Sequence, residues 1–585
     1  MKLSTGIALL GLVLDMSLNS EWTTPYEASD KMASATYEEA IDYYQRLSEA
    51  YPEISLLEGG KTDVGRPLHL VVIDGDGFND PQEVAEAGKV VLFINNGIHP
   101  GEPCGIDASM MLARDLVQEK AFNDLLKHVT VVLVPIYNVG GSLNRGCCSR
   151  ANQVGPEAYG FRGNARNLDL NRDFIKADSK NAKAFTAFFQ AWKPHLFIDT
   201  HTTNGADYQA TMTYLPSHPD KLGPQTGPYM QNELIPAMEK WMSKTPYILS
   251  PYVNSVGSTP DDGIAAFLDA PRYSSGYAAL SYSMGFTTEA HMLKSFEDRV
   301  SATYSFLEGM IRHAHKNASD LRNAVEADRQ AAASQKLFAV DWELDQTDSV
   351  MIDFKGFEAK YKPSEVTGQP RLYYDRSAPY TKPIPYYHRF AAKAEVETPD
   401  AYLIPQVYSE VIERLEMNGV ELKQIAVDTV LDVEVYRIED VNTLNFPWEG
   451  HYFHRNVVVS KDFVSLPFYA GDYVAFTNQT TNPYLVHTLE PFSTDAFFRW
   501  NFFDAILMRK EYFSPYVFED EAAAMLSENV ELKQAFEALK AQDSVFAAQP
   551  RMQLNYLYEH SEHYEQSYNR YPVVRWTGEN PLPLK

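Results

Sequence analysis

An unbroken apolar run at Val90–Ile94 leads into the polar loop Asn95–Glu102, and this pair of features constrains the fold most. The run lacks the alternation of a half-exposed strand, so it predicts a strand buried on both faces, as in a parallel sheet. The loop carries an imidazole, His99, and a carboxylate, Glu102. Open α/β sheets bind their ligands at the carboxyl ends of strands. We therefore predict that His99 and Glu102 are ligands of a metal ion.

Strand-like and helix-like segments alternate along residues 21–335. Further buried strands are expected at Val129–Pro135, Leu196–Thr200 and Gly285–Glu289. Helices are expected at Pro103–Glu119, Asn181–Trp192 and Ser295–His315. This order is typical of an α/β/α sandwich around a mixed, mostly parallel sheet, and we predict that fold for a first domain at 21–335.

The length requires a second region. At 585 residues the chain is too long for one hydrophobic core, because single cores stop growing near roughly 250–300 residues. Short strand-like runs and proline-rich turns begin after residue 335, and Asp495–Tyr516 and Glu519–Lys540 have helical character. We predict a mixed α+β accessory region at 336–585, β-rich first and helical at its end. It could be an interaction or sugar-binding module, or a lid over the site.

The charge balance argues against nucleic acid as a partner. The chain has 51 Lys and Arg residues against 78 Asp and Glu residues, a net charge of −27. Binding to a phosphate backbone requires concentrated positive charge. We interpret the acidity as a solvated surface that favours solubility.

The three cysteines do not predict a disulfide framework. They are Cys104, Cys147 and Cys148, and an odd number cannot pair completely. A bond between the adjacent Cys147 and Cys148 is disfavoured, because neighbouring residues fit the usual disulfide geometry poorly.

Residues 1–20 predict a signal peptide. Lys2 precedes the apolar run Ile7–Leu14, which has the length of a signal-peptide core and is too short to span a bilayer. No clean cleavage site follows it, and the alternative is a ragged N-terminal helix. No later stretch is long and apolar enough for a transmembrane helix. We therefore expect a secreted or periplasmic protein without a stable membrane span.

A third metal ligand is expected where the strand Leu196–Thr200 ends at His201. Catalytic zinc sites of the His₂Glu type require two neutral imidazoles, one carboxylate and an open position for water. His99, Glu102 and His201 supply that set. Alone, each has an ordinary explanation as a solvated loop residue or a packed core histidine, but their shared placement at strand ends favours a metal.

Two further segments carry groups that peptide hydrolysis needs. The strand Gly285–Glu289 ends in a carboxylate that could accept a proton from water and later protonate a leaving amine. The segment Phe161–Phe174 contains three arginines, whose guanidinium groups bind carboxylates through paired hydrogen bonds. The alternatives are a strand-end charge for Glu289 and a surface salt-bridge region for the arginines.

These residues together resemble the zinc carboxypeptidase family of pancreatic carboxypeptidase A, over about residues 35–320. The resemblance rests on an ordered set: His99-x-x-Glu102, Asp169-x-Asn171-Arg172, His201 and Glu289. It implies that His99, Glu102 and His201 bind one zinc ion and that Asp169 orients one of the imidazoles. The part of the chain that follows resembles the C-terminal extensions of some bacterial members.

The resemblance also implies how a substrate is held. Asn171 and Arg172 would grip its C-terminal carboxylate. Arg162 would polarise the scissile carbonyl, with Arg166 as the second choice. Tyr273 is the best match to the mobile tyrosine of the family, and Tyr277 is the alternative.

The predicted activity is the hydrolysis of C-terminal peptide bonds by zinc-activated water, with Glu289 as general base and acid. The substrate would be a peptide or protein with a free C-terminal carboxylate. Two alternatives keep the fold and the zinc: an amidohydrolase or deacylase, and a cell-wall peptide hydrolase. A non-catalytic binding protein is disfavoured because Glu289 and all three ligands are present.

Overall fold

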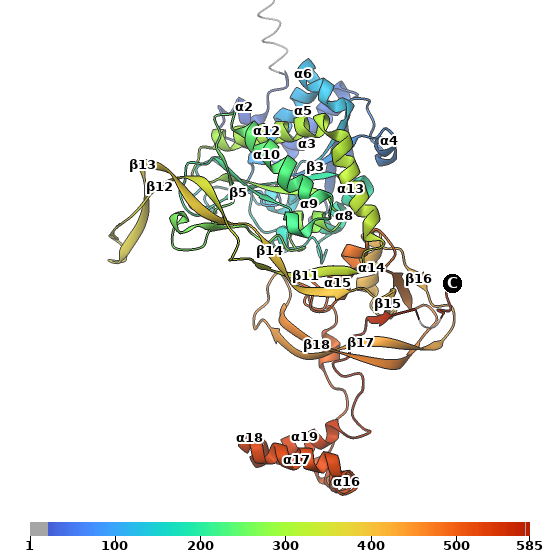
Figure 1. Cartoon of the computed structure of the whole chain (residues 1–585). Coiled ribbons are helices and arrows are strands. Elements are labelled where there is room, and N and C mark those ends of the chain that lie inside the picture. The colour runs from blue at the N-terminus through green and yellow to red at the C-terminus, as the bar shows by residue number, and fades with distance from the viewer. Residues whose placement is uncertain (1–20, 579–580) are drawn as a thin grey trace, which may run out of the picture.

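The computed structural model describes residues 21–578 and 581–585. The signal peptide expected at residues 1–20 lies outside the described residues. An α/β body occupies one end of the molecule, and a β-rich region with a projecting helical tail occupies the other (Figure 1). Within the described residues, no helix is both long enough and apolar enough to cross a membrane.

The α/β body is built on an eight-stranded mixed sheet with the spatial order β1-β2-β4-β3-β5-β10-β6-β7. The strands are β1 (Ile54–Lys61), β2 (Pro67–Ile73), β3 (Val90–Asn95), β4 (Val129–Val134), β5 (Leu196–Thr203), β6 (Met212–Pro216), β7 (Leu249–Pro251) and β10 (Met284–His291). The central strands β4, β3, β5 and β10 run parallel, whereas β1, β2 and β6 pair antiparallel towards the edges. The expected α/β fold around a mixed sheet is confirmed, with its parallel strands concentrated at the centre.

Helices cover both faces of this sheet, because the central strands present apolar side chains on each side. On β3, Leu92 and Ile94 pack into one core, and Val91 and Phe93 pack into the other. The first face carries α3 (Tyr37–Ala50), α5 (Cys104–Gln118), α10 (Ile235–Met242), α12 (Phe296–Lys316) and α13 (Ala318–Ala332). The second face carries α8 (Lys180–Trp192) and α11 (Ser274–Ala279).

Local sequence signals set where these helices begin. The hydroxyl groups of Thr36, Ser179 and Ser295 each accept a backbone N–H in the first turn of α3, α8 and α12. Such caps satisfy amide groups that have no partner within the helix. At α3 the cap is reciprocal, since a Glu39 carboxylate oxygen accepts the Thr36 N–H at 2.8 Å.

The accessory region begins with two antiparallel strand pairs. β11 (Leu337–Leu344) pairs with β14 (Phe390–Glu397), and β12 (Val350–Pro363) forms a long hairpin with β13 (Pro370–Tyr387). The hairpin reaches away from the body in Figure 1. Its inner end joins the short strands β8 (Asn254–Ser255) and β9 (Ile264–Ala265), so it is anchored to the α/β body.

A six-stranded sheet and a helical tail complete the accessory region. The sheet has the order β16-β19-β15-β20-β17-β18 and consists of β15 (Ala401–Ile404), β16 (Lys423–Gln424), β17 (Thr429–Thr443), β18 (His454–Phe468), β19 (Tyr473–Phe476) and β20 (Val574–Trp576). The tail consists of α16 (Pro515–Glu528), α17 (Val530–Gln542), α18 (Ser544–Ala548) and α19 (Pro550–Glu559), and it projects from the sheet (Figure 1).

The two regions share one hydrophobic core. The cluster on the second face of the eight-stranded sheet runs from Phe93 and Phe185 to Tyr484, Phe497 and Tyr571 without a break. The helices α14 (Ser409–Met417) and α15 (Asn482–Leu489) contribute to it. The accessory region therefore forms the outer layer over this face and is not a separate domain.

The prediction of a helix at Asp495–Tyr516 is wrong. The segment forms turns with a single short 3₁₀ stretch, Asp504–Leu507. Its aromatic residues Phe497, Phe498 and Trp500 are fully buried, so core packing rather than helical hydrogen bonding determines its path. The expected helix at Glu519–Lys540 exists but is divided into α16 and α17 at Asn529.

We predict that Gly105→Ala destabilises the protein and disturbs the end of β5. A methyl group on this α5 residue would lie 2.0 Å from Oγ1 of Thr200, the neighbour of His201. Overpacking of this kind costs about 1–3 kcal/mol, more than the helix propensity gained by alanine. Thermal unfolding of the full-length variant should show a lower midpoint.

The matched control is Gly146→Ala, because a methyl group there meets nothing within 4 Å. This variant should unfold like the native protein. A Gly105→Ala midpoint equal to that of the control would contradict the packing of α5 on β5.

Candidate active site

Three adjacent strands end at one edge of the sheet and bring the candidate residues together. The loop after β3 carries His99 and Glu102, β5 carries His201, and β10 carries Glu289. Glu289 lies directly opposite His201 in the parallel register of β10 and β5. Because parallel strands end at the same edge, residues far apart in the sequence meet there.

A cavity of about 400 Å³ opens at this edge. Eight of the residues singled out from the sequence line it: His99, Glu102, Arg162, Asn171, Arg172, His201, Tyr273 and Glu289. Asp169 lies directly behind His99. Arg166 does not line the cavity and is exposed, with its guanidinium group directed at the Asp178 carbonyl. Tyr277 is buried in the core, where its hydroxyl group donates to Asn418 at 2.6 Å.

The side chains of His99, Glu102 and His201 have the spacing of a metal site. Nδ1 of His99 lies 3.2 Å from Nδ1 of His201, and the two nitrogens lie 3.3 and 3.1 Å from oxygens of Glu102. Zinc bonds of roughly 2.0–2.2 Å would place tetrahedral ligand atoms about 3.3–3.6 Å apart. Within the described part of the chain, this is the one cluster of at least three such groups that could hold a metal ion.

Two buried carboxylates fix which nitrogen of each imidazole faces the cluster. Nε2 of His99 lies 2.9 Å from Oδ1 of Asp169, and Nε2 of His201 lies 2.8 Å from Oδ2 of Asp199. A carboxylate accepts hydrogen bonds only, so each Nε2 carries a hydrogen, and a ring that is neutral presents its lone pair at Nδ1. Two such lone pairs facing a carboxylate repel one another unless a cation lies between them, so the donor set fits zinc.

Asp169 connects the ligand cluster to the arginines. Its Oδ2 accepts from Nη2 and Nε of Arg162 at 2.8 and 3.1 Å, and Arg172 lies 3.7 Å away. Burial alone would raise the pKa of Asp169, but His99 and the two guanidinium groups outweigh it and hold that pKa well below its usual range. The side chain is therefore a permanent anion that orients both His99 and Arg162.

Glu289 also lines the cavity and is not one of the three candidate metal ligands. Burial raises its pKa to about 7, with a further contribution from Glu102 and an opposing one from His201. A carboxyl group poised near neutrality can both take up and release a proton. Its position opposite His201 places that exchange beside the ligand cluster.

Asn171, Arg172 and Tyr273 form a second group in the cavity. The backbone N–H of Ser274 donates to Oδ1 of Asn171 at 3.2 Å, which fixes the orientation of the amide. The guanidinium group of Arg172 lies 4.5 Å from the centre of the Tyr273 ring and donates to the Asn171 carbonyl at 2.8 Å. A cation and an amide held side by side suit a carboxylate ligand.

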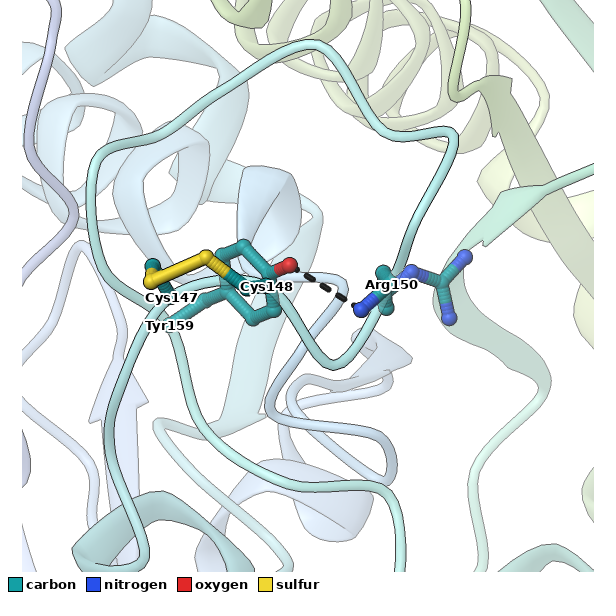
Figure 2. Close-up of a disulfide and its surroundings, with 4 residues drawn as sticks. All are labelled: Cys147, Cys148, Arg150 and Tyr159. Atoms are coloured by element: carbon teal, nitrogen blue, oxygen red, sulfur yellow. Dashed lines mark hydrogen bonds between the residues drawn. A yellow bond between two sulfur atoms is a disulfide. The ribbon is translucent and has the colours of Figure 1, made fainter.

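Arg150 also lines the cavity and was not found from the sequence. Its Nη1 donates to Oε1 of Glu102 at 2.6 Å, and its Nη2 donates to the Thr202 carbonyl at 2.8 Å. The Arg150 backbone N–H donates to the hydroxyl group of Tyr159 at 3.0 Å (Figure 2). Arg150 therefore holds the carboxylate of Glu102 at Oε1, the oxygen that also faces His99.

The loop that carries Arg150 contains a disulfide between Cys147 and Cys148, as Figure 2 shows. The expectation that these neighbours would remain unpaired is wrong. Cys148 has a φ of 82°, a left-handed backbone conformation uncommon outside glycine, and the two Cα atoms lie 3.7 Å apart. Cys104 is buried and free.

Three other histidines, His291, His451 and His454, have structural partners. Nε2 of His291 lies 2.8 Å from the Ala206 carbonyl oxygen, and its Nδ1 accepts the Leu293 N–H. His451 pairs with Asp178 and His454 pairs with Asp504, so these two histidines do not converge on a common site.

A zinc carboxypeptidase family model matches residues 40–263. That range belongs to the zinc carboxypeptidase family. It includes all three candidate ligands, Asp169, Asn171 and Arg172, but ends before Tyr273 and Glu289. Zinc carboxypeptidases are metallopeptidases, a class of peptide-bond hydrolases.

The alignment with a curated relative extends beyond residues 40–263. Carboxypeptidase 2 of Trichophyton equinum is 22% identical over 507 residues, which cover 82% of this chain and 86% of the relative. Such an alignment includes part of the accessory region. A metallo-carboxypeptidase structure from Burkholderia cenocepacia is 18% identical, with a TM-score of 0.37 over 48% of this chain and 70% of its own. The carboxypeptidase A structure from Helicoverpa armigera is 18% identical, with a TM-score of 0.36 over 50% and 74%.

We predict that Asp199→Asn weakens zinc binding, because it removes the charge that fixes the His201 ring. Loss of such a partner typically costs roughly 10–100-fold in metal affinity or activity. The zinc dissociation constant can be measured by competition with a chromogenic chelator.

Asp504→Asn is the control, since it removes the carboxylate partner of His454 at a comparable 2.9 Å contact in the accessory region. It should bind zinc like the native protein. Equal zinc affinities for Asp199→Asn and the native protein would contradict the role of Asp199.

Proposed function

We propose that this protein is a zinc-dependent carboxypeptidase that hydrolyses the C-terminal peptide bond of peptides with a free carboxylate. The observation that carries the proposal is the convergence of a His₂Glu ligand set, a buried acid and a carboxylate clamp in one cavity. Each group serves a different requirement of the reaction, and no simple structural role explains all of them at one sheet edge.

One zinc ion would be held by Nδ1 of His99, Nδ1 of His201 and a carboxylate oxygen of Glu102. Bound zinc supplies Lewis-acid activation of water and of the scissile carbonyl. Asp169 and Asp199 keep the two imidazoles in place through hydrogen bonds at Nε2, and Arg150 holds Glu102 through a hydrogen bond to Oε1. The ligand geometry is therefore largely prepared before the metal arrives.

Glu289 would move the proton. Its carboxylate takes a proton from the attacking water and returns it to the nitrogen of the leaving amine. A pKa raised to about 7 by burial suits both halves of this exchange, since the group is neither a permanent anion nor a permanent acid near neutral pH.

Arg162, Asn171 and Arg172 would bind the substrate. Arg172 and Asn171 lie next to one another in the cavity and present a guanidinium group and an amide to the terminal carboxylate. Arg162 lies nearer the ligand cluster, 3.5 Å from Oε1 of Glu102, where a donor stabilises charge that develops on the carbonyl oxygen. Tyr273, stacked on Arg172, would close over the terminal residue.

We also propose that the protein acts outside the cytoplasm. Disulfides persist in oxidising compartments, and the Cys147–Cys148 bond lies on an exposed loop. The apolar run Ile7–Leu14 supports the same conclusion, because it has the composition of a signal-peptide core.

Glu289→Gln should abolish most turnover without loss of zinc. The amide cannot carry the proton, and general acid–base catalysis contributes roughly 10²–10⁴-fold to rate. We expect kcat to fall by about that factor while zinc affinity stays within about twofold. Steady-state hydrolysis of a C-terminal peptide substrate, paired with metal titration, checks both. A kcat close to native would contradict the assignment of Glu289.

Amidation of the peptide C-terminus should prevent cleavage, because it removes the anion that the clamp binds. Arg172→Ala should lower kcat/KM for the free acid by roughly 10–100-fold, the range expected for a lost hydrogen bond to a charged group. Arg166→Ala is the matched control, since this arginine lies in the same segment outside the cavity. Equal rates for free and amidated peptides would favour an endopeptidase or deacylase instead.

A further inference from the structure

The loop between β17 and β18 reaches across from the accessory region to the back of the candidate active site. Oε2 of Glu449 accepts the backbone N–H of Asp169 at 2.7 Å. Glu449 is partly buried and has a φ of 49°, so the loop holds it in a left-handed conformation that directs it to this contact. Asp169 is the residue whose side chain orients His99 and Arg162.

The same loop helps to enclose Arg272, the neighbour of Tyr273. The guanidinium carbon of Arg272 lies 4.9 Å from the ring centre of Trp448, 5.0 Å from that of Phe453 and 5.5 Å from that of Trp500. The Arg272 backbone N–H donates to Oδ2 of the fully buried Asp495 at 2.9 Å, and Nε of the guanidinium group lies 2.8 Å from Oδ1 of the same carboxylate. Aromatic faces and a buried anion together hold a guanidinium group firmly.

A third link follows further along the Asp169 segment. His451 of the same loop lies 2.6 Å from Oδ2 of Asp178, and Arg414 of α14 donates to Oδ1 of Asp178 at 3.0 Å. The accessory region therefore contacts both ends of the segment 169–178, as well as the segment that leads to Tyr273.

We propose that the accessory region is a structural part of the active site and that Glu449 is a positioning residue for Asp169. Glu449 fixes the Asp169 backbone, the Asp169 carboxylate fixes the His99 ring, and the ring presents Nδ1 to the metal. Displacements well below 1 Å in such a chain of contacts alter catalysis, because metal ligands and reacting groups require close alignment. This proposal rests on the proposed zinc carboxypeptidase function.

General attachment of the two regions is a different role, and a second interface contact separates it from this one. Lys183 on α8 and Glu413 on α14 form an ion pair of 2.6 Å that also joins the regions. The pair lies outside the cavity and touches no residue proposed for catalysis. Glu413→Ala therefore removes an acidic side chain from the same interface without reaching the site.

The test compares three full-length variants with the native protein. Glu449→Asn shortens the side chain so that it no longer reaches Asp169, and asparagine tolerates the left-handed backbone. Glu449→Gln keeps an oxygen that can accept the Asp169 N–H. Zinc dissociation constants from chelator competition, kcat, KM and the thermal unfolding midpoint are measured for each.

We expect Glu449→Asn to weaken zinc binding and lower kcat by about tenfold, the value of a hydrogen bond to a charged group, with KM nearly unchanged. Glu449→Gln should stay within about threefold of native, and Glu413→Ala should match native. Native zinc affinity and kcat in Glu449→Asn would overturn the proposal, as would an equal loss in Glu413→Ala. If the native protein itself neither binds zinc nor cleaves peptides, the proposed function fails first and this inference fails with it.

If Glu449→Asn unfolds at a lower temperature, the comparison is made with Glu449→Gln and Glu413→Ala at a temperature where all three are folded. A loss of zinc affinity in Glu449→Asn that Glu449→Gln and Glu413→Ala do not share at that temperature supports positioning by the Glu449 side chain. Native zinc affinity in Glu449→Asn, or an equal loss in Glu413→Ala, would overturn it.

Discussion

Two imidazole nitrogens held 3.2 Å apart beside a carboxylate are the constraint on which the rest of the site depends. Carboxylates behind the rings direct both lone pairs inwards, so the arrangement is favourable only with a cation or a proton at its centre. The fold maintains the cluster by ending β3, β5 and β10 at one edge and by closing the back of the rings with Asp169 and Asp199.

Features that depend on the local pattern of apolar and polar residues could be predicted from the sequence. The buried run at Val90–Ile94 and the alternation of strands and helices were sufficient to predict the fold of the α/β body. The positions of His99, His201 and Glu289 near strand ends were sufficient to predict that these residues lie close together. Asp199 could have been found as well, because it precedes His201 by two residues and so shares its face of β5. Arg150 could not, because its loop has no periodicity.

The accessory region was harder to predict because its contacts are long-range. Glu449 contacts Asp169 across 280 positions of the sequence, and no local pattern marks it. The segment around Phe497 and Trp500 has helical composition, yet it folds as turns because burial of its rings outweighs helix propensity. Since the second core includes residues of both regions, the catalytic sheet lacks a complete cover without the chain after residue 335.

The most direct measurement is X-ray diffraction from crystals of the zinc-loaded protein, recorded above and below the zinc absorption edge. We expect one anomalous peak at roughly 2.0–2.2 Å from Nδ1 of His99, Nδ1 of His201 and a carboxylate oxygen of Glu102. Asp169 and Asp199 should remain hydrogen-bonded to the Nε2 atoms of the two rings. A peak elsewhere in the molecule, or zinc bound through Nε2 with the rings reversed, would show that the ligand assignment is wrong.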